Sequence, residues 1–188
     1  DLENLGKVAD LIPTGTKLAL GMMGRYEGVA FTLVGRLQYS WKSGVWDEWY
    51  ASFTDGRWGW VAEAQGRYYV TFKVTNRAVP PSRQVRPGQR VQLEGLGAFA
   101  ASDYKEAEIV TGQGELPEVV KPGETTASWD LDGPRGSFAT IDYSNPAQPS
   151  LFVGKQATLE QLKLGDNPNE GIEAANKGSR PSGDKLKC

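Results

Sequence analysis

The sequence predicts an all-β protein, folded as an antiparallel meander or as partly open, barrel-like sheets with at most one or two short helical turns. Three observations lead to this class. Aromatic and β-branched residues occur in runs that alternate with a period of two, rather than at helical spacing. The 188 residues include 23 glycines and 11 prolines, which supply many turns. Tight-turn signals recur at short intervals between Val29 and Val74.

The length suits one domain, or two small ones that share a core. We expect a lead segment over residues 1–10, a single β-rich domain over residues 11–164, and a disordered tail or linker over residues 165–188. Within the domain, the halves 11–75 and 89–164 are joined by a loop rich in proline and arginine, which cannot form a central strand.

The stretch from Val29 to Val74 is predicted to form four antiparallel strands. In the first of them the apolar face carries Val29, Phe31, Leu33, Leu37 and Tyr39, and in the second it carries Val45, Trp49, Ala51 and Phe53. A three-residue loop, Lys42-Ser43-Gly44, brings both apolar faces to one core. This register sets Leu33 opposite Phe53.

The next two hairpins are predicted by the same criterion, that the register should bury a single apolar face. A two-residue Asp55-Gly56 turn pairs Phe53 with Trp58 and Ala51 with Trp60, which makes Trp49, Trp58 and Trp60 a packing layer. For the last hairpin, a two-residue Gln65-Gly66 turn and a three-residue Ala64-Gln65-Gly66 loop are both possible. We favour the longer loop, because it places Val70 beside Trp60 and a one-residue slip would turn the apolar set away from the core.

The remaining elements are short. A first strand is predicted at Lys17 to Leu20, and the helix-like spacing of Leu2, Leu5 and Val8 marks a marginal helix in the lead segment. Strands of the second half are predicted at Arg90–Leu93, Gly97–Ala101, Tyr104–Thr111, Thr125–Leu131, Gly136–Tyr143 and Leu151–Val153. Residues 158–161 have the spacing of a capping box and are expected to begin one helical turn.

Composition excludes several kinds of chemistry. The chain has no histidine, which removes Ser-His-Asp and Cys-His catalysis and any histidine metal site. The single cysteine, Cys188, permits no internal disulfide. A net charge of −2 creates no electrostatic field that would attract nucleic acid or an anionic membrane, so we expect neither as a partner. The sequence shows no signal peptide and no apolar run of membrane-spanning length, so we expect no membrane insertion. We expect no cofactor. Because the chain begins at Asp1, we expect it to be a processed or excised piece.

Asp47, Glu48 and Glu63 form the most obvious acidic group, and two carboxylates can act as an acid/base pair. The predicted register argues against such a pair. Asp47 and Glu48 are adjacent in a strand and point to opposite faces, with Asp47 toward the core side. Glu48 is expected opposite Glu63, where Arg67 relieves the repulsion between the two carboxylates.

Trp41, Trp46 and Tyr50 are the candidate ligand-binding residues. Trp46 and Tyr50 fall on the face opposite Trp49, and Trp41 lies at the edge of a loop. Exposed aromatic rings of this kind stack on sugars or other small ligands. The plainer alternative is that another layer of the fold covers them.

Two further segments are interpreted as loops. Residues 112–117, Gly-Gln-Gly-Glu-Leu-Pro, lack the third glycine of a dinucleotide fingerprint and the lysine of a P-loop. The arginines between residues 77 and 90 lack the interleaved aromatics that single-strand binding needs, and indicate a solvated linker.

Several motifs in order resemble a bacterial domain-of-unknown-function family numbered 4178. They are Gly-Arg-Leu-Gln-Tyr, Trp-Asp-Glu-Trp-Tyr, Asp-Gly-Arg-Trp-Gly-Trp-Val-Ala-Glu and Gly-Arg-Tyr-Tyr-Val, followed by segments at 104–108, 112–117, 142–143 and 154–164. Together they cover most of residues 11–164. The resemblance implies a cytoplasmic bacterial protein with no established activity or catalytic residues.

The resemblance also implies a zinc ribbon next to this domain in many family members. Cys188 is then a possible first zinc ligand of such a ribbon, or a tail cysteine without a partner. This chain by itself is not expected to bind structural zinc.

We expect a non-catalytic β-rich binding or scaffold module that engages a protein partner. The alternative is carbohydrate or small-ligand binding through Trp41, Trp46 and Tyr50. A carboxylate-dependent hydrolase is the weaker alternative, because it needs two carboxylates that converge in a pocket.

Overall fold

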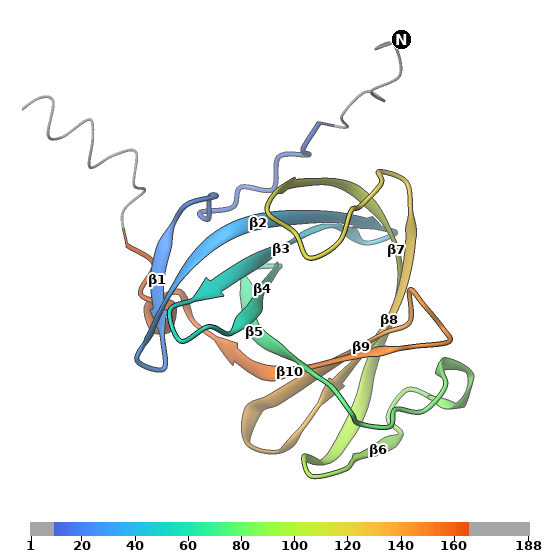
Figure 1. Cartoon of the computed structure of the whole chain (residues 1–188). Helices are drawn as coiled ribbons and strands as arrows, with labels where there is room; N and C mark the ends of the chain where they lie inside the picture. The colour runs from blue at the N-terminus through green and yellow to red at the C-terminus, as the bar shows by residue number, and fades with distance from the viewer. Residues whose placement is uncertain (1–9, 166–188) are drawn as a thin grey trace, which may run out of the picture.

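The computed structural model describes residues 10–165, which form ten strands, two 3₁₀ turns and one helical turn (Figure 1). The strands are β1 Met23–Tyr26, β2 Val29–Trp41, β3 Gly44–Phe53, β4 Trp58–Ala64, β5 Arg67–Val74, β6 Arg90–Leu93, β7 Gly97–Gly114, β8 Thr125–Asp132, β9 Ser137–Asp142 and β10 Ser150–Ala157. The 3₁₀ turns are η1 Ser82–Gln84 and η2 Pro134–Gly136, and the helical turn is α1 Leu159–Leu162.

The strands close into an antiparallel barrel. The ring runs β2-β3-β4-β5-β10-β9-β8-β7, and the pairing of β7 with β2 completes it. β1 and β6 extend the sheet beside β2 and β7. The predicted all-β class is therefore confirmed, with a barrel that is closed rather than partly open. The single helical turn carries the predicted capping box between Thr158 and Gln161.

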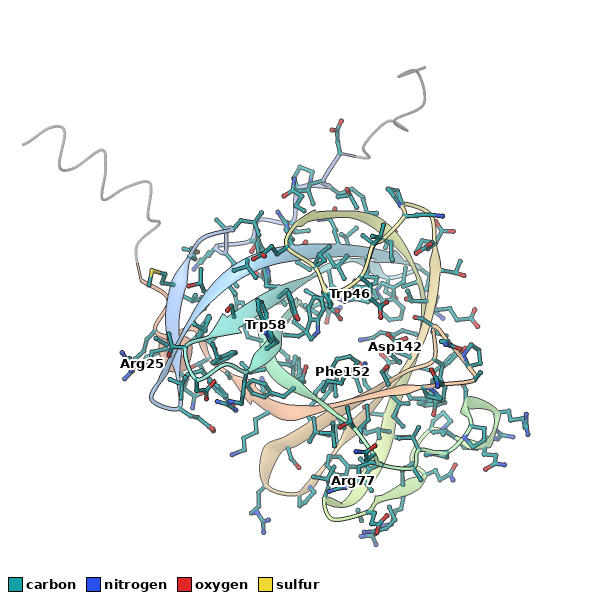
Figure 2. All side chains as sticks on the ribbon, viewed as in Figure 1. Arg25, Trp46, Trp58, Arg77, Asp142 and Phe152 are labelled. Atoms are coloured by element: carbon teal, nitrogen blue, oxygen red, sulfur yellow. The ribbon has the colours of Figure 1, made fainter. Side chains whose placement is uncertain are left out.

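The register of the pairs decides which side chains face the interior of the barrel. From β3 across to β9, the face that carries Glu48 and Tyr50 continues through Trp60, Thr71 and Thr140. Figure 2 shows Trp46, Asp142 and Phe152 on this face pointing into the ring of strands, whereas Arg25 and Arg77 point away from it. The inner face is therefore aromatic and polar.

The apolar residues that stabilise the fold lie mainly on the outer face, in two clusters. The first outer cluster comprises Leu18, Tyr26, Phe31, Leu33, Trp49, Ala51, Phe53, Val61, Tyr68, Val70, Ala157 and Leu162. The second comprises Val85, Val91, Leu93, Phe99, Ala101, Trp129, Leu131, Ala139, Ile141, Tyr143 and Leu151.

Segments outside the ring cover both clusters. Leu18 from the chain before β1 and Leu162 from α1 cover the first cluster. β6 and Val85, from the loop after β5, cover the second. In that loop Pro80 accepts a hydrogen bond of 2.6 Å from the Tyr143 hydroxyl. Burying an outer sheet face in this way removes apolar area from water as a central core does.

All three predicted hairpin loops are wrong in length by one residue. The loop after β2 is Lys42-Ser43, because Trp41 pairs with Gly44, and Leu33 pairs with Ala51 rather than Phe53. The Asp55-Gly56 hairpin has three loop residues, because the Phe53 amide donates to the Arg57 carbonyl.

The last turn is Gln65-Gly66, two residues with positive φ. Val61, not Trp60, is therefore opposite Val70. Val70 and Trp60 lie on opposite faces of the sheet, so the predicted three-residue loop is excluded.

The predicted registers differ from the observed ones because both faces of β3 and β4 carry large aromatic rings. A single apolar face therefore does not define the register. Gly59 in β4 must face outward, because the Phe53 and Phe72 rings occupy the space beside its Cα. Trp58 and Trp60 then point inward, and of the predicted packing layer only Trp49 lies in an outer cluster. A bulge between Leu33 and Gly35 also places Leu33 outside and Leu37 inside.

Smaller differences from the predicted elements lie elsewhere in the chain. The short strand predicted at Lys17 to Leu20 is absent from the described residues, and β1 lies at Met23–Tyr26 instead. The two strands predicted at 97–101 and 104–111 form one long strand, β7. The predicted helix of the lead segment and the predicted disorder after residue 165 fall on residues outside the described range.

Gly154 in β10 gives a direct test of the barrel packing. A Cβ at this position would overlap the Val70 carbonyl of the neighbouring strand. We expect Gly154→Ala to lower the free energy of unfolding by about 3 kcal/mol or more, because backbone must move. Urea denaturation measures the change. Gly165→Ala is the control, because its nearest neighbour would be 4.0 Å away. A Gly154→Ala variant as stable as the wild type would contradict this packing.

Candidate functional site

The inner face of the barrel is the candidate site, because aromatic and charged side chains converge on it and solvent reaches them. Its aromatic residues are Tyr39, Trp41, Trp46, Tyr50, Trp58, Trp60, Tyr69, Phe138 and Phe152. All of them are partly buried except Trp58, which is 47% exposed. A packed core would leave such rings fully buried.

The aromatic residues near the β2–β3 hairpin form one group. Tyr39 and Trp46 stack with ring centroids 4.9 Å apart. Trp41 meets Trp46 edge to face, at 6.3 Å and 88°. The Lys105 ammonium, from β7, lies 5.6 Å from the Trp41 ring and 5.5 Å from the Trp46 ring. We call Trp41, Trp46 and Lys105 the aromatic corner.

A second aromatic group lies on the same face of β3 and β4. Tyr50 stacks on Trp58 at 4.9 Å and lies 4.8 Å from Trp60. The structure thus brings the three candidate ligand-binding residues, Trp41, Trp46 and Tyr50, onto one face. This face lines the barrel interior and is not an outer surface. Their role in binding stays a prediction.

Charged side chains from three strands accompany the aromatic corner. Lys105 donates to Asp130 at 2.8 Å, and Thr140 donates to the other carboxylate oxygen of Asp130 at 2.9 Å. Asp142 holds the turn after β9 by accepting from the Ser144 amide and hydroxyl. Glu48 accepts from the Trp46 indole at 3.3 Å.

The pKa of Glu48 is raised to about 7, mainly by burial and also by the carboxylates of Asp142 and Asp130, whereas the hydrogen bond from Trp46 and the charge of Lys105 oppose the shift. Tyr39 shares this environment. Its pKa is raised well above the ordinary value, first by burial and then by the charge of Glu48. The interior therefore holds a carboxyl group that changes its charge near neutral pH.

Asp47 and Glu63, the other two predicted acidic residues, lie on the outer face. They are opposite each other in the β3–β4 pair, and Glu48 is opposite Ala62, so the predicted Glu48–Glu63 pair is wrong. Arg67 pairs with Ala64 rather than lying beside Glu63. The one-residue slip of the hairpin accounts for both differences.

A network of hydrogen bonds occupies Asp47 and Glu63. Asp47 is buried and accepts from Arg36 at 2.9 Å, Gln38 at 3.1 Å and Thr14 at 2.8 Å. Glu63 accepts from Thr16 at 2.6 Å, and from Trp49 and Tyr68 at 3.3 Å each. These bonds tie the chain before β1 onto the barrel. Asp47 and Glu63 therefore have a structural role in attaching this segment to the barrel.

The glycine-bearing segment 112–117 has a structural role at the inner face. The loop between β7 and β8 folds back so that the Glu115 carbonyl lies where a Cβ would stand on Gly35, and the Leu116 and Val120 side chains lie where one would stand on Gly112. The Glu115 amide donates to the Val34 carbonyl at 2.8 Å. In Figure 1 this loop crosses in front of β2 and β3. It therefore covers part of the interior, and the glycines make its close approach possible.

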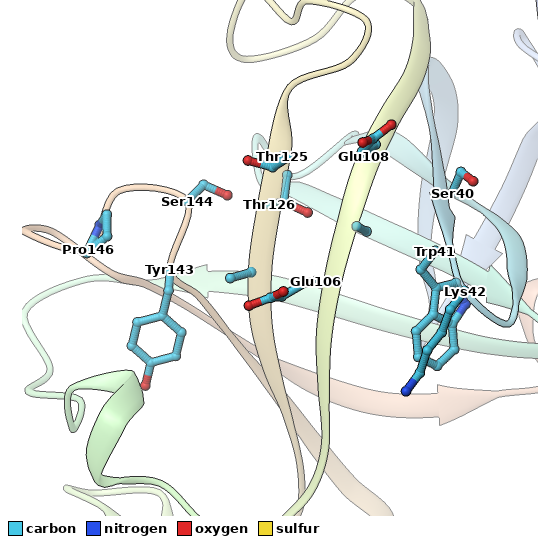
Figure 3. A pocket seen from close by; sticks show the side chains of 12 residues that line it. Ser40, Trp41, Lys42, Glu106, Glu108, Thr125, Thr126, Tyr143, Ser144 and Pro146 are labelled. Carbon is cyan, nitrogen blue, oxygen red and sulfur yellow. The ribbon is translucent and has the colours of Figure 1, made fainter.

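A hollow with a volume of about 710 Å³ lies on the flank of β7 and β8, and it shares Trp41 with the aromatic corner (Figure 3). Trp41 and Lys42 line one side of it, and Tyr143 lines the other. Glu106 and Glu108 between them are exposed. This hollow offers separate solvated groups, whereas the interior offers side chains that already contact one another.

Sequence reasoning missed Lys105, Asp130, Thr140 and Asp142. A signal was present, because Asp130 alternates with Trp129 and Leu131, and Thr140 and Asp142 alternate with Ala139 and Ile141. That pattern ordinarily indicates a solvated outer face. Only closure of the ring shows that these polar residues face the interior.

Within residues 10–165, no three histidine, cysteine, aspartate or glutamate side chains form a group able to hold a metal ion. Cys188, the possible first ligand of a zinc ribbon, lies outside the described residues. In the same part of the chain, no helix has the length and apolar character needed to cross a membrane.

The raised pKa of Glu48 predicts a pH-dependent stability. Between pH 4.5 and about 7 the folded protein holds a proton that the unfolded chain has released, so the free energy of unfolding falls as the pH rises through this window. Glu48→Gln removes the ionisable group, and with it this fall in the free energy of unfolding. We expect the variant to match the wild type near pH 4.5 and to exceed its stability by about 1–3 kcal/mol at pH 8.

Urea denaturation at a series of pH values measures this difference. Glu94→Gln is the matched control, because Glu94 is exposed and should leave the pH dependence unchanged. A Glu48→Gln variant that loses stability over the same window as the wild type would show that Glu48 does not carry the effect.

The family model described as Domain of unknown function (DUF4178) matches residues 19–158, which contain the whole ring of strands. Comparison with curated proteins and with solved structures gave no significant match. The matched residues include the aromatic corner, Glu48, Asp130 and the loop after β7. The chain belongs to the DUF4178 family.

Proposed function

We propose that the barrel is a binding module for a small organic ligand, held among the aromatic and charged side chains of the inner face. One observation carries the proposal. The apolar side chains that stabilise the fold face outward, while partly exposed rings and charges face inward. An eight-stranded barrel is of the size that either fills its interior with side chains or holds one small ligand.

The composition of the inner face lowers the stability of the fold, and a binding function would account for it. Glu48 lies near Asp130 and Asp142, and burial of these charges opposes folding. Trp46 and Tyr50 keep part of their apolar area exposed, whereas rings of the outer clusters such as Trp49 are buried. Side chains that reduce stability and converge in one place are typical of functional sites.

The polar groups also define what the ligand should contain. Rings such as Trp41, Trp46 and Tyr50 stack against flat or apolar surfaces, and Glu48 and Asp130 accept hydrogen bonds. A ligand with both an apolar body and a polar group uses both kinds of contact. The predicted alternative of a small-ligand binder is thus the function that the geometry supports best.

A neutral fluorescent probe, N-phenylnaphthylamine, tests whether the interior binds small molecules. We expect its emission to rise on binding, with energy transfer from tryptophan. Trp46→Leu should weaken binding about tenfold, because it removes the ring that stacks with Tyr39. Tyr104→Leu is the control, because Tyr104 is an exposed aromatic residue on the outer face. Absence of binding, or equal loss in both variants, would refute the proposal.

Acid–base catalysis is a second candidate, and the observation that favours it is the pKa of Glu48 at about 7 with Asp142 and Asp130 nearby. Such a carboxyl group can donate a proton at neutral pH. The hydrolase predicted as the weaker alternative would lose turnover in Glu48→Gln and keep probe binding. Binding without turnover in the wild type would leave the binding module alone. The protein partner predicted from the sequence stays a prediction.

A further inference from the structure

The aromatic corner has the geometry of a site for a positively charged head group. The Trp41 and Trp46 rings are nearly perpendicular, and one ammonium group, that of Lys105, lies at almost the same distance from both. Ring faces attract cations through their negative quadrupole, and tryptophan does so most strongly. The corner therefore already holds a cation, supplied by the protein itself.

The charges around the corner favour a second positive charge. Glu48, Asp130 and Asp142 lie close enough to interact, and Lys105 is the cation among them. Glu48 contacts Trp46 directly. An anionic ligand would meet these carboxylates, whereas a cationic ligand would relieve their mutual repulsion.

Lys105 can leave the rings and still have a carboxylate partner. Its ammonium lies 2.8 Å from Asp130 and 3.9 Å from Asp103, and Asp103 is half exposed. The four-carbon stem of lysine permits a shift toward Asp103. The rings would then be free for another cation.

We propose that the ligand of this barrel is an organic cation of the alkylammonium class, whose head group replaces the Lys105 ammonium between Trp41 and Trp46. This inference rests on the proposed binding function and adds the chemistry of the ligand. Tyr50, Trp58 and Trp60, on the same inner face, supply aromatic surface for the apolar body.

Three compounds of nearly equal shape test the inference. They are choline, its neutral carbon analogue dimethylbutanol, and the anion dimethylbutanoate. Binding is followed by NMR, through the indole signals of Trp41 and Trp46. We expect choline to bind about tenfold more tightly than the alcohol, and the anion to bind most weakly. We also expect shifts of both indole signals.

Two variants sharpen the test. Lys105→Met removes the internal cation and keeps the length of the side chain, so it should raise the affinity for choline by about threefold or more. Trp41→Leu removes one ring face and should abolish the preference for choline over the alcohol, while the fold, checked by circular dichroism, remains.

The inference is overturned if the alcohol or the anion binds as well as choline, if choline does not bind, or if its binding leaves both indoles unshifted. Binding of N-phenylnaphthylamine to the interior distinguishes this failure from failure of the proposed function. A protein that binds the neutral probe without preferring choline would keep its role as a binding module and lose only the cationic ligand.

Discussion

The pairing of β2 with β7 is the constraint on which the rest of the structure depends. β2 is long enough to pair with β1 and β3 in its first half and with β3 and β7 in its second half. A bulge after Leu33 separates the two halves and reverses which side chains face inward. Once β7 pairs with β2, the sheet has a single enclosed face, and every residue on that face must accommodate the others. The aromatic corner and the group around Glu48 exist because of this closure.

The apolar clusters that stabilise the fold and the proposed binding site lie on opposite faces of the same strands. The outer face buries two apolar clusters under the chain before β1, α1, β6 and the loop after β5. These clusters supply the hydrophobic stabilisation that an ordinary small barrel obtains from its interior. The interior is thereby free to hold Glu48, Asp130 and Lys105, whose burial would otherwise endanger a domain of marginal stability. The hydrogen bonds of Asp47 and Glu63 to the chain before β1 belong to the stabilising side of this division.

Local features of the fold were predictable from the sequence. Which face of each strand points into the barrel was not. The all-β class, the bounds of β2 and β6, and the capping box of α1 follow from alternation and turn chemistry. Sidedness failed because the prediction assumed one apolar face, whereas Trp49 and Trp60 lie on opposite faces of neighbouring strands. Trp41, Trp46 and Tyr50 lie on the face opposite Trp49, as alternation predicts, and their role in binding stays a prediction. Their partners Lys105 and Asp130 come from strands more than fifty residues later, and no local pattern links them.

Proton NMR of Lys105 tests whether the pairing of β7 with β2 closes the barrel and brings side chains of β7 and β3 together on its inner face. The Lys105 ammonium lies 5.5 Å from the Trp46 ring, although β7 and β3 are not paired. We expect nuclear Overhauser effects between the terminal methylene protons of Lys105 and the Trp46 indole, together with an upfield ring-current shift of those methylene protons. Methylene signals at the shift of a free lysine, with no contact to either Trp41 or Trp46, would show that the barrel does not close in this way.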